Sequence, residues 1–338
     1  MKDVRDKLGR TLRDLRISVM DQCNFRCSYC MPAEVFGPEY AFLKKKELLT
    51  TDEILRMVGA ATELGVNKIR ITGGEPLLRK EVVSIVQKIS DLGVVEDIAL
   101  TTNGWLLPTF AQRLKEAGLH RINLSLDSLD DATFRKMNGR NKSVEGVLKG
   151  LDAAVDVNLP VKVNMVVEKG INEQDIIPMA RYFRERKITL RFIEYMDAGN
   201  FHHWQQEEVL PTKEVIKILN TEFPLEPIDP NYRGEVAKRY RYLDGAGEVG
   251  VISSISQPFC SDCHRARLSA DGKIYKCLFS SIGIDFKQVL REGISREDLV
   301  DRLAKLWLGR DDRYSEIRSQ INPNEPHDPK VEMSYIGG

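Results

Sequence analysis

The six cysteines of this 338-residue chain fall into two sets of three that lie far apart in the sequence. The first set is a C-x3-C-x2-C run, and the second is a C-x2-C pair followed later by a single cysteine. A cubane iron–sulfur cluster has four iron corners, and an electron carrier ligates each corner with a thiolate, so three thiolates leave one iron free. The pattern predicts two open-cornered clusters, an arrangement suited to chemistry rather than to electron storage. The ligands are Cys23, Cys27 and Cys30, and Cys260, Cys263 and Cys277.

Composition narrows the class of protein. Lys+Arg and Asp+Glu both total 50, so the formal net charge is zero, and we expect no nucleic-acid partner because such proteins carry a basic excess. The sequence has no run of about 18 apolar residues, so we expect no membrane association. The charged first ten residues lack the apolar core of a signal peptide. We therefore expect a cytoplasmic protein, in which clustered cysteines are metal ligands rather than disulfides.

Short apolar strands alternate with helical segments from about residue 12 to residue 195. This alternation predicts an α/β fold with a parallel sheet and helical crossovers. Six strands are too few for a closed eight-stranded barrel, so we predict an open, partial TIM-type (β/α)6 barrel. The predicted strands are 14–20, 67–72, 96–102, 120–126, 160–167 and 189–195, and the predicted helices are 51–64, 80–92, 106–117, 143–157 and 173–187.

The pattern changes after the sixth strand, where helices and short strands mix. We predict two domains, the barrel over 1–211 and a smaller α+β domain over 212–338 that closes the lumen. The tail from 322 onward reads as a loop. The predicted elements are helices at 212–221, 285–292 and 295–308, and strands near 238–243, 249–252, 265–269 and 273–276.

Each predicted strand has one apolar and one polar face, as Arg16 between Leu15 and Ile17 illustrates. Helices cover the outside of a parallel barrel, so the polar faces must line the lumen. Buried unpaired charge is costly, so lumen cations need an anion. Internal carboxylates or solvated strand ends would explain one or two cations, but four favour an anionic ligand. They are Arg16, Lys68, Arg70 and Lys162.

Candidate motifs follow the carboxyl ends of the strands, where barrel folds place their chemistry. We therefore predict the active site at this end. The motifs are Cys23–Cys30 after the first strand, Gly73-Gly74-Glu75-Pro76 after the second, Thr101–Gly104 after the third, Ser125–Asp127 after the fourth and Met196-Asp197 after the sixth.

Two of these motifs carry a resemblance. Cys23–Cys30 resembles the signature of the radical S-adenosylmethionine (SAM) enzymes, and Gly73–Pro76 resembles their methionine-binding turn. Together with the segments Leu15–Pro32 and Phe259–Leu268 and the terminal Gly337-Gly338, the chain is similar over nearly its whole length to one family among them. That family is the GTP 3′,8-cyclases, which begin molybdenum-cofactor biosynthesis.

The resemblance implies a cofactor for each cysteine set. The first set would hold a 4Fe-4S cluster whose open iron binds SAM, and one-electron reduction would cleave SAM to a 5′-deoxyadenosyl radical. The second set would hold a 4Fe-4S cluster whose open iron binds guanine. The implied SAM contacts are Tyr29, Gly74, Ser125 and Met196. The GTP contacts that the resemblance and the polar strand faces assign are Arg16, Lys68, Arg70, Thr101, Lys162, Arg265, Ala266 and Arg267, of which Arg265 and Arg267 would be catalytic.

The implied reaction is a lyase reaction. The radical would remove the ribose 3′ hydrogen, and the carbon radical would attack C8 to give (8S)-3′,8-cyclo-7,8-dihydroguanosine 5′-triphosphate. The implied partners are an electron donor such as flavodoxin or ferredoxin, the next pathway enzyme, cyclic pyranopterin monophosphate synthase, and a second copy of the chain in a homodimer. The Gly337-Gly338 tail would reach into the active site.

Three alternatives remain. His264 stands where the family usually has Asn, and it completes the C-x2-C-H pattern of c-type haem attachment, which leaves Cys277 unexplained. A non-catalytic zinc module would need four closed ligands where each set supplies three. Another radical SAM enzyme with an auxiliary cluster could modify peptides or tetrapyrroles, but such extensions generally hold more than three cysteines.

Overall fold

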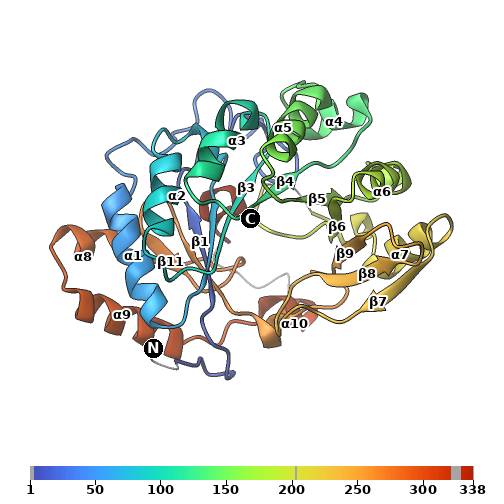
Figure 1. The fold of residues 1–338 in the computed structure, drawn as a ribbon. Helices are drawn as coiled ribbons and strands as arrows, with labels where there is room; N and C mark the ends of the chain where they lie inside the picture. Colours follow the sequence, from blue (N-terminus) through green and yellow to red (C-terminus); the bar gives the residue numbers. More distant parts are fainter. Residues whose placement is uncertain (1–3, 202–203, 321–328, 338) are drawn as a thin grey trace.

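A single twelve-stranded sheet organises the protein (Figure 1). The computed structural model describes residues 4–201, 204–320 and 329–337. Six parallel strands form its middle, and each lies within two residues of its predicted range. They are β1 (Asp14–Ser18), β2 (Lys68–Thr72), β3 (Asp97–Thr102), β4 (Arg121–Ser125), β5 (Val161–Val167) and β6 (Thr189–Glu194).

Helices between these strands cover the outer face of the sheet (Figure 1). Local sequence explains where they begin: Thr50 Oγ1 accepts from the Glu53 amide at 3.2 Å, and the Glu53 carboxylate accepts from the Thr50 amide at 2.7 Å, a capping box. One short, polar helix, α4, was not predicted. The helices are α1 (Thr51–Glu63), α2 (Val82–Ser90), α3 (Leu107–Glu116), α4 (Asp131–Asn138), α5 (Val144–Asp156) and α6 (Ile176–Glu185).

The C-terminal part of the chain extends both edges of the sheet. At one edge β10 (Arg265–Leu268) pairs parallel with β1, and β11 (Lys273–Tyr275) and β12 (Ile284–Asp285) follow antiparallel. At the other, β9 (Glu248–Ile252) pairs parallel with β6, followed by β8 (Lys238–Tyr242) and β7 (Leu225–Ile228). The sheet has two free ends, β12 and β7, so the predicted open partial barrel is confirmed.

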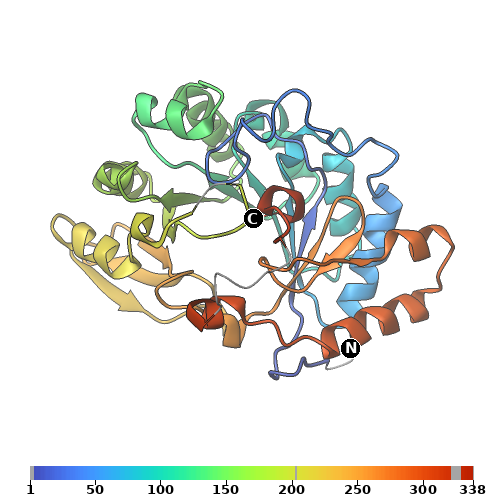
Figure 2. The ribbon, with the colours of Figure 1, turned by 180° about the vertical axis from the view of Figure 1, so that it is seen from behind.

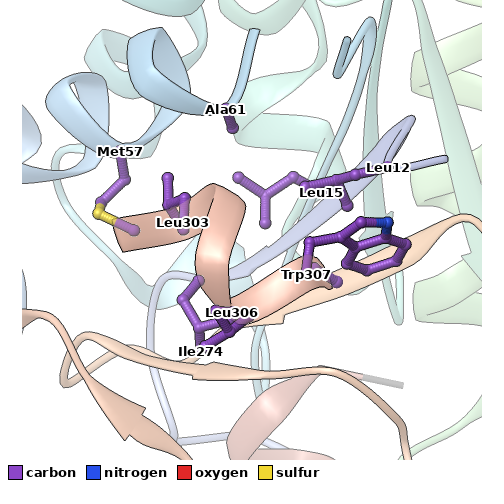
Figure 3. Close-up of a pocket in the computed structure, with 9 residues that line it drawn as sticks. Leu12, Leu15, Met57, Ala61, Ile274, Leu303, Leu306 and Trp307 are labelled. Carbon is purple, nitrogen blue, oxygen red and sulfur yellow. The ribbon is translucent and has the colours of Figure 1, made fainter. Parts of the chain in front are cut away.

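The remaining helices pack around the two added edges. Helix α9 lies against α1, and a cavity of about 10 Å³ between them and the sheet is lined by side chains such as Leu15, Met57 and Trp307 (Figure 3). A space this small takes no ligand, so this face is closed core. The helices are α7 (Thr212–Asn220), α8 (Lys287–Arg291), α9 (Arg296–Leu308), α10 (Tyr314–Ile317) and α11 (Met333–Ile336).

Helix α11 corrects the prediction of a loop-like tail. It lies against β1 on the concave face of the sheet, with the described end of the chain beside it (Figure 2). Among the described residues, no helix is long and apolar enough to cross a membrane.

Candidate active site

The strand register gathers guanidinium groups on the concave face. Arg16 on β1 is paired with Arg267 on β10 and with Arg70 on β2, so three arginines form one row across three strands. The row below it places Asp14 between Arg265 and Lys68. The polar strand faces therefore converge, and the two predicted arginines of β10, more than 240 residues away in sequence, join the same face.

These cations lack enough counter-charge. Burial and the neighbouring charges of Arg70 and Arg267 lower the pKa of Arg16 well below its usual value. Burial and Arg265 lower the pKa of Arg267 to about 10. Arg16 Nε, Arg70 Nε and one terminal nitrogen of Arg267 are buried with no hydrogen-bond partner in the described part of the chain. An anion in the lumen would satisfy these donors.

Two further cations face the same space from the opposite side of the barrel. Lys162 on β5 lies in one row with Thr101 and Asn123 of the neighbouring strands. Burial and the positive charges of Arg191 and Arg121 lower the pKa of Lys162 to about 8. Arg191 on β6 was missed, although its neighbours Leu190 and Phe192 are buried and the alternation marks it as lumen-facing. Burial, Arg70 and Arg121 lower the pKa of Arg191 to about 10.

Removing the missed cation tests whether it serves the anion site. We expect Arg191→Met to raise KM for the nucleotide that the resemblance implies about tenfold or more, because a hydrogen bond to a charged group contributes roughly 1.5–3 kcal/mol. Arg191→Lys should lie between this variant and the parent, and Arg296→Met, whose parent side chain is 74% exposed, should change nothing. Steady-state kinetics measure the effect, and an unchanged KM in Arg191→Met would remove Arg191 from the site.

Ala266 differs from its two neighbours. Its methyl group lines the closed cavity on the helix side, because successive side chains of a strand point to opposite faces. Arg265 and Arg267 point into the lumen, and an Arg265 terminal nitrogen lies 3.5 Å from Cys263 Sγ. The side chain of Ala266 therefore faces away from the lumen, and its contact with the nucleotide stays a prediction for its main chain.

The first cysteine loop joins the glycine turn at the carboxyl end of the sheet. The Gly74 amide donates to the Met20 carbonyl at 2.7 Å, and the Glu75 amide donates to the Gln22 carbonyl at 2.8 Å. A Cβ on Gly74 would lie 2.3 Å from the Gln22 oxygen, so only glycine permits this approach. The turn that begins after β2 therefore fixes the backbone leading into Cys23.

The other predicted SAM contacts end at the same edge. Ser125 closes β4, and Met196 follows β6, each half-buried. Tyr29 donates its hydroxyl to Asp127 Oδ2 at 2.7 Å, and burial raises the pKa of Asp127 to about 6. Asp127 thus anchors the cysteine loop to β4, a role that the sequence pattern did not reveal.

The second cysteine set assembles at the opposite end of the lumen. Cys263 precedes β10, whose start lies beside the start of β1. Strand β11 runs back antiparallel, with Tyr275 opposite Arg267, and continuing that register brings Cys277 level with Arg265. The hairpin therefore explains why a cysteine far along the chain meets the C-x2-C pair.

A buried ion network holds this second set in place. Asp6 Oδ2 accepts from Arg10 Nε at 2.6 Å and from Arg310 at 3.0 Å, and all three side chains are at most 1% exposed. Arg10 donates to the Cys260 carbonyl at 2.7 Å. Arg310 donates to the Cys263 carbonyl at 2.9 Å and lies 3.2 Å from Cys263 Sγ.

Breaking this network should destabilise the fold. We expect Asp6→Asn to lower the free energy of unfolding by about 3 kcal/mol, because losing one partner leaves buried charge uncompensated. The midpoint of anaerobic urea unfolding measures the loss. Asp311→Asn is the matched control, since its ion pair with Lys7 is about 60% exposed on both sides and such pairs contribute under about 1 kcal/mol. Equal effects in the two variants would contradict the role of the network.

The donor set of each site is three thiols, the ligands that iron–sulfur clusters take. All six cysteines are free and half-buried. In residues 4–201, 204–320 and 329–337, no three Cys, His, Asp or Glu side chains are arranged to hold one metal ion, whereas a cubane distributes its thiolates over separate iron corners. Burial raises the pKa of Cys23 and Cys30 to about 12. Burial also acts on Cys263, but Arg265 and Arg310 outweigh it and lower its pKa to about 6.

The chain end is clamped beside the site. Asp197, next to Met196, accepts from the Tyr314 hydroxyl at 2.6 Å and from Lys330 Nζ at 2.8 Å. A Cβ on Gly337, whose φ is +74°, would lie 2.0 Å from Thr72 Cγ2 at the end of β2. Gly337 therefore lies on the lumen side of the sheet, and residues 321–328 and Gly338 are outside the described residues.

Comparisons with known proteins agree with this geometry. Residues 17–183 match the Radical SAM superfamily, and residues 188–316 match Molybdenum Cofactor Synthesis C. The chain is 48% identical over 339 aligned positions to a GTP 3′,8-cyclase of Staphylococcus saprophyticus and to one of Staphylococcus aureus strain JH9, covering all of each protein.

Solved structures share the fold at low identity. Streptococcus suis SuiB bound to S-adenosylmethionine is 15% identical with a TM-score of 0.63, over 93% of this chain and 69% of that one. Native anSMEcpe with bound AdoMet and the Cp18Cys peptide is 16% identical with a TM-score of 0.58, over 96% and 94%.

Proposed function

This chain belongs to the radical SAM superfamily and, within it, to the GTP 3′,8-cyclases, and we propose how its residues divide that reaction between the two ends of the lumen. It is a lyase that cyclises GTP in the first step of molybdopterin biosynthesis, and its cofactors are two 4Fe-4S clusters and SAM. The roles of individual residues and the partners below are proposals.

One observation carries the division of labour: the two cysteine sets lie beyond opposite ends of β1. Cys23 follows the end of β1. Cys263 lies near the start of β1, because the Arg13 amide, just before the strand, donates to the carbonyl of the adjacent His264 at 3.0 Å. Five residues of strand span about 16 Å at roughly 3.3 Å per residue. We infer that GTP occupies the space between, with its guanine at the second set.

The first set and its neighbours hold the radical source. Cys23, Cys27 and Cys30 would ligate the cluster, and Tyr29, Gly74, Ser125 and Met196 would bind SAM. When bound, the cluster and SAM supply the radical that removes a hydrogen atom from the ribose. The chain's own residues orient SAM and exclude water around it, since the loop, the glycine turn and Asp127 are tied together by hydrogen bonds.

The cations hold the substrate. Five cations would bind the triphosphate: Arg16, Lys68, Arg70, Lys162 and Arg191. Arginine suits this role because its guanidinium group can donate two hydrogen bonds to one phosphate. Thr101 would contact the nucleotide from β3. Arg265 and Arg267 would be catalytic, because they point into the lumen between the second cysteine set and Arg16.

Several partners follow from the proposed chemistry. An electron donor such as flavodoxin or ferredoxin would reduce the first cluster, and cyclic pyranopterin monophosphate synthase would take the product. We propose a cytoplasmic homodimer. We also propose residues 1–211 as the unit for radical formation and 212–338 as the unit that binds the second cluster and substrate.

Anaerobic reconstitution tests the proposal. The protein is loaded with iron and sulfide, then given SAM, a reductant and GTP, and the products are separated by mass spectrometry. We expect 5′-deoxyadenosine and a nucleotide with the mass of GTP but a changed spectrum. Zinc without acid-labile sulfide would support a binding module instead, and product from a peptide but not from GTP would support the other radical SAM alternative.

A further inference from the structure

The loop between β7 and β8, residues 229–237, crosses the lumen. Its hairpin lies at one end of the sheet, where β8 stands six strands beyond β2 in the strand order, yet Tyr232 contacts the side chain of Lys68 on β2. The Lys68 ammonium lies 3.3 Å from the centre of the Tyr232 ring. Contact between strands so far apart in the sheet requires the loop to span the opening between them.

The same loop is braced against the second cysteine set. Arg233 Nε donates to Asp262 Oδ1 at 3.0 Å. Gly234, with φ of +84°, packs so closely on His264 that a Cβ would lie 2.5 Å from the imidazole ring and 2.8 Å from the Asp262 carbonyl. His264 therefore supports the loop.

The inner side of the loop meets the cation cluster. The negative charge of Glu235 interacts favourably with the positive charges of Arg191 and Lys162. The Glu235 carboxylate accepts a hydrogen bond from the main-chain amide of Asn231 at 2.7 Å. Tyr232 is 45% exposed, so one side of its ring faces solvent while the other covers Lys68. The loop thus lies over the side of the lumen where Lys68, Lys162 and Arg191 gather.

We propose that this loop covers the triphosphate end of the nucleotide site, and that Tyr232 is a positioning residue that selects triphosphates by holding Lys68 for the terminal phosphates. The proposal rests on the proposed function, which places GTP in the lumen. An ammonium on an aromatic face is attracted by the ring and loses rotational freedom, while its remaining N–H donors stay free for an anion. A nucleoside monophosphate has no group to reach Lys68, so it gains nothing from the ring.

Substitution at Tyr232 tests the selection of triphosphate. On the reconstituted enzyme we expect Tyr232→Leu to raise Kd and KM for GTP about fivefold with kcat unchanged, given the strength of a partly buried cation–π contact. Kd for GMP should stay the same. Tyr232→Phe, which keeps the ring, should match the parent, and SAM cleavage without substrate should be unaffected in both variants.

The brace provides a second, independent variant. Gly234→Ala should raise KM for GTP as Tyr232→Leu does, because its Cβ meets His264 and displaces the loop. Gly245→Ala is the matched control: its φ of +79° imposes similar backbone strain, but a Cβ there meets nothing within 4 Å. We expect the control to keep the parent's KM.

Three outcomes would overturn the proposal: unchanged GTP affinity in Tyr232→Leu, equal weakening of GTP and GMP, or equal loss in Tyr232→Phe. These are binding measurements, so they are separable from the reaction itself. If the parent binds GTP more tightly than GMP and Tyr232→Leu reduces that difference about fivefold, the positioning role stands even where no cyclised product forms, and only the assigned reaction fails.

Discussion

Cys23→Ser should abolish SAM cleavage, whereas Cys277→Ser should keep part of that cleavage and lose the cyclised nucleotide. The reason is the separation of the two cysteine sets along β1: the first lies beside the glycine turn, the second beside Arg265. A serine hydroxyl is a poor replacement for a thiolate at an iron corner. Each variant should therefore lose one cluster and keep the function of the other.

Two measurements separate these effects. Mass spectrometry quantifies 5′-deoxyadenosine and the nucleotide product, and iron analysis should show about half of the roughly eight irons that two cubanes contain. All six cysteines belong to a set, so the control is Ser261→Ala, an exposed position inside the second loop, which should behave like the parent. If Cys23→Ser and Cys277→Ser lose both products equally, the two ends of the lumen do not act separately.

Local sequence patterns were sufficient to predict the barrel strands and most of the residues that face the lumen. Alternation of apolar and polar residues located β1 to β6 and identified Arg16, Arg70 and Lys162 as inward-facing, because that alternation is a property of each strand alone. The same rule, had it been applied to the sixth strand, would have found Arg191. It also shows why Ala266 faces away from Arg265 and Arg267, which the motif by itself did not.

The pairing of strands that lie far apart in the sequence could not be predicted in the same way. Nothing in residues 265–268 specifies β1 as their neighbour, and the contact that matters, Arg267 beside Arg16, depends on a register set across some 250 residues. Asp6 and Arg310 are similar, since each looks like a surface charge until the fold buries them together. Helix α11 was missed because four residues are too few for a helical period.

Gly74→Ala should severely damage the SAM site although it adds only one methyl group. Its Cβ would meet the Gln22 carbonyl oxygen at 2.3 Å, its carbon at 2.6 Å and the Asp21 oxygen at 2.8 Å. These are backbone atoms, so no side chain can rotate away, and either the glycine turn or the loop into Cys23 must move. A shift of about 1 Å in a positioning element costs roughly 100-fold in rate.

We therefore expect Gly74→Ala to lower the rate of SAM cleavage about 100-fold or more and to weaken SAM binding, while GTP binding at the other end of the lumen is retained. Anaerobic single-turnover cleavage and equilibrium dialysis with each ligand measure the two effects. Gly59→Ala, on α1 with open space where its Cβ would lie, is the control and should be neutral or slightly stabilising, because alanine is favoured over glycine within a helix. Normal cleavage by Gly74→Ala would mean that the loop and the turn can separate without consequence, and that the close approach of their backbones does not position SAM.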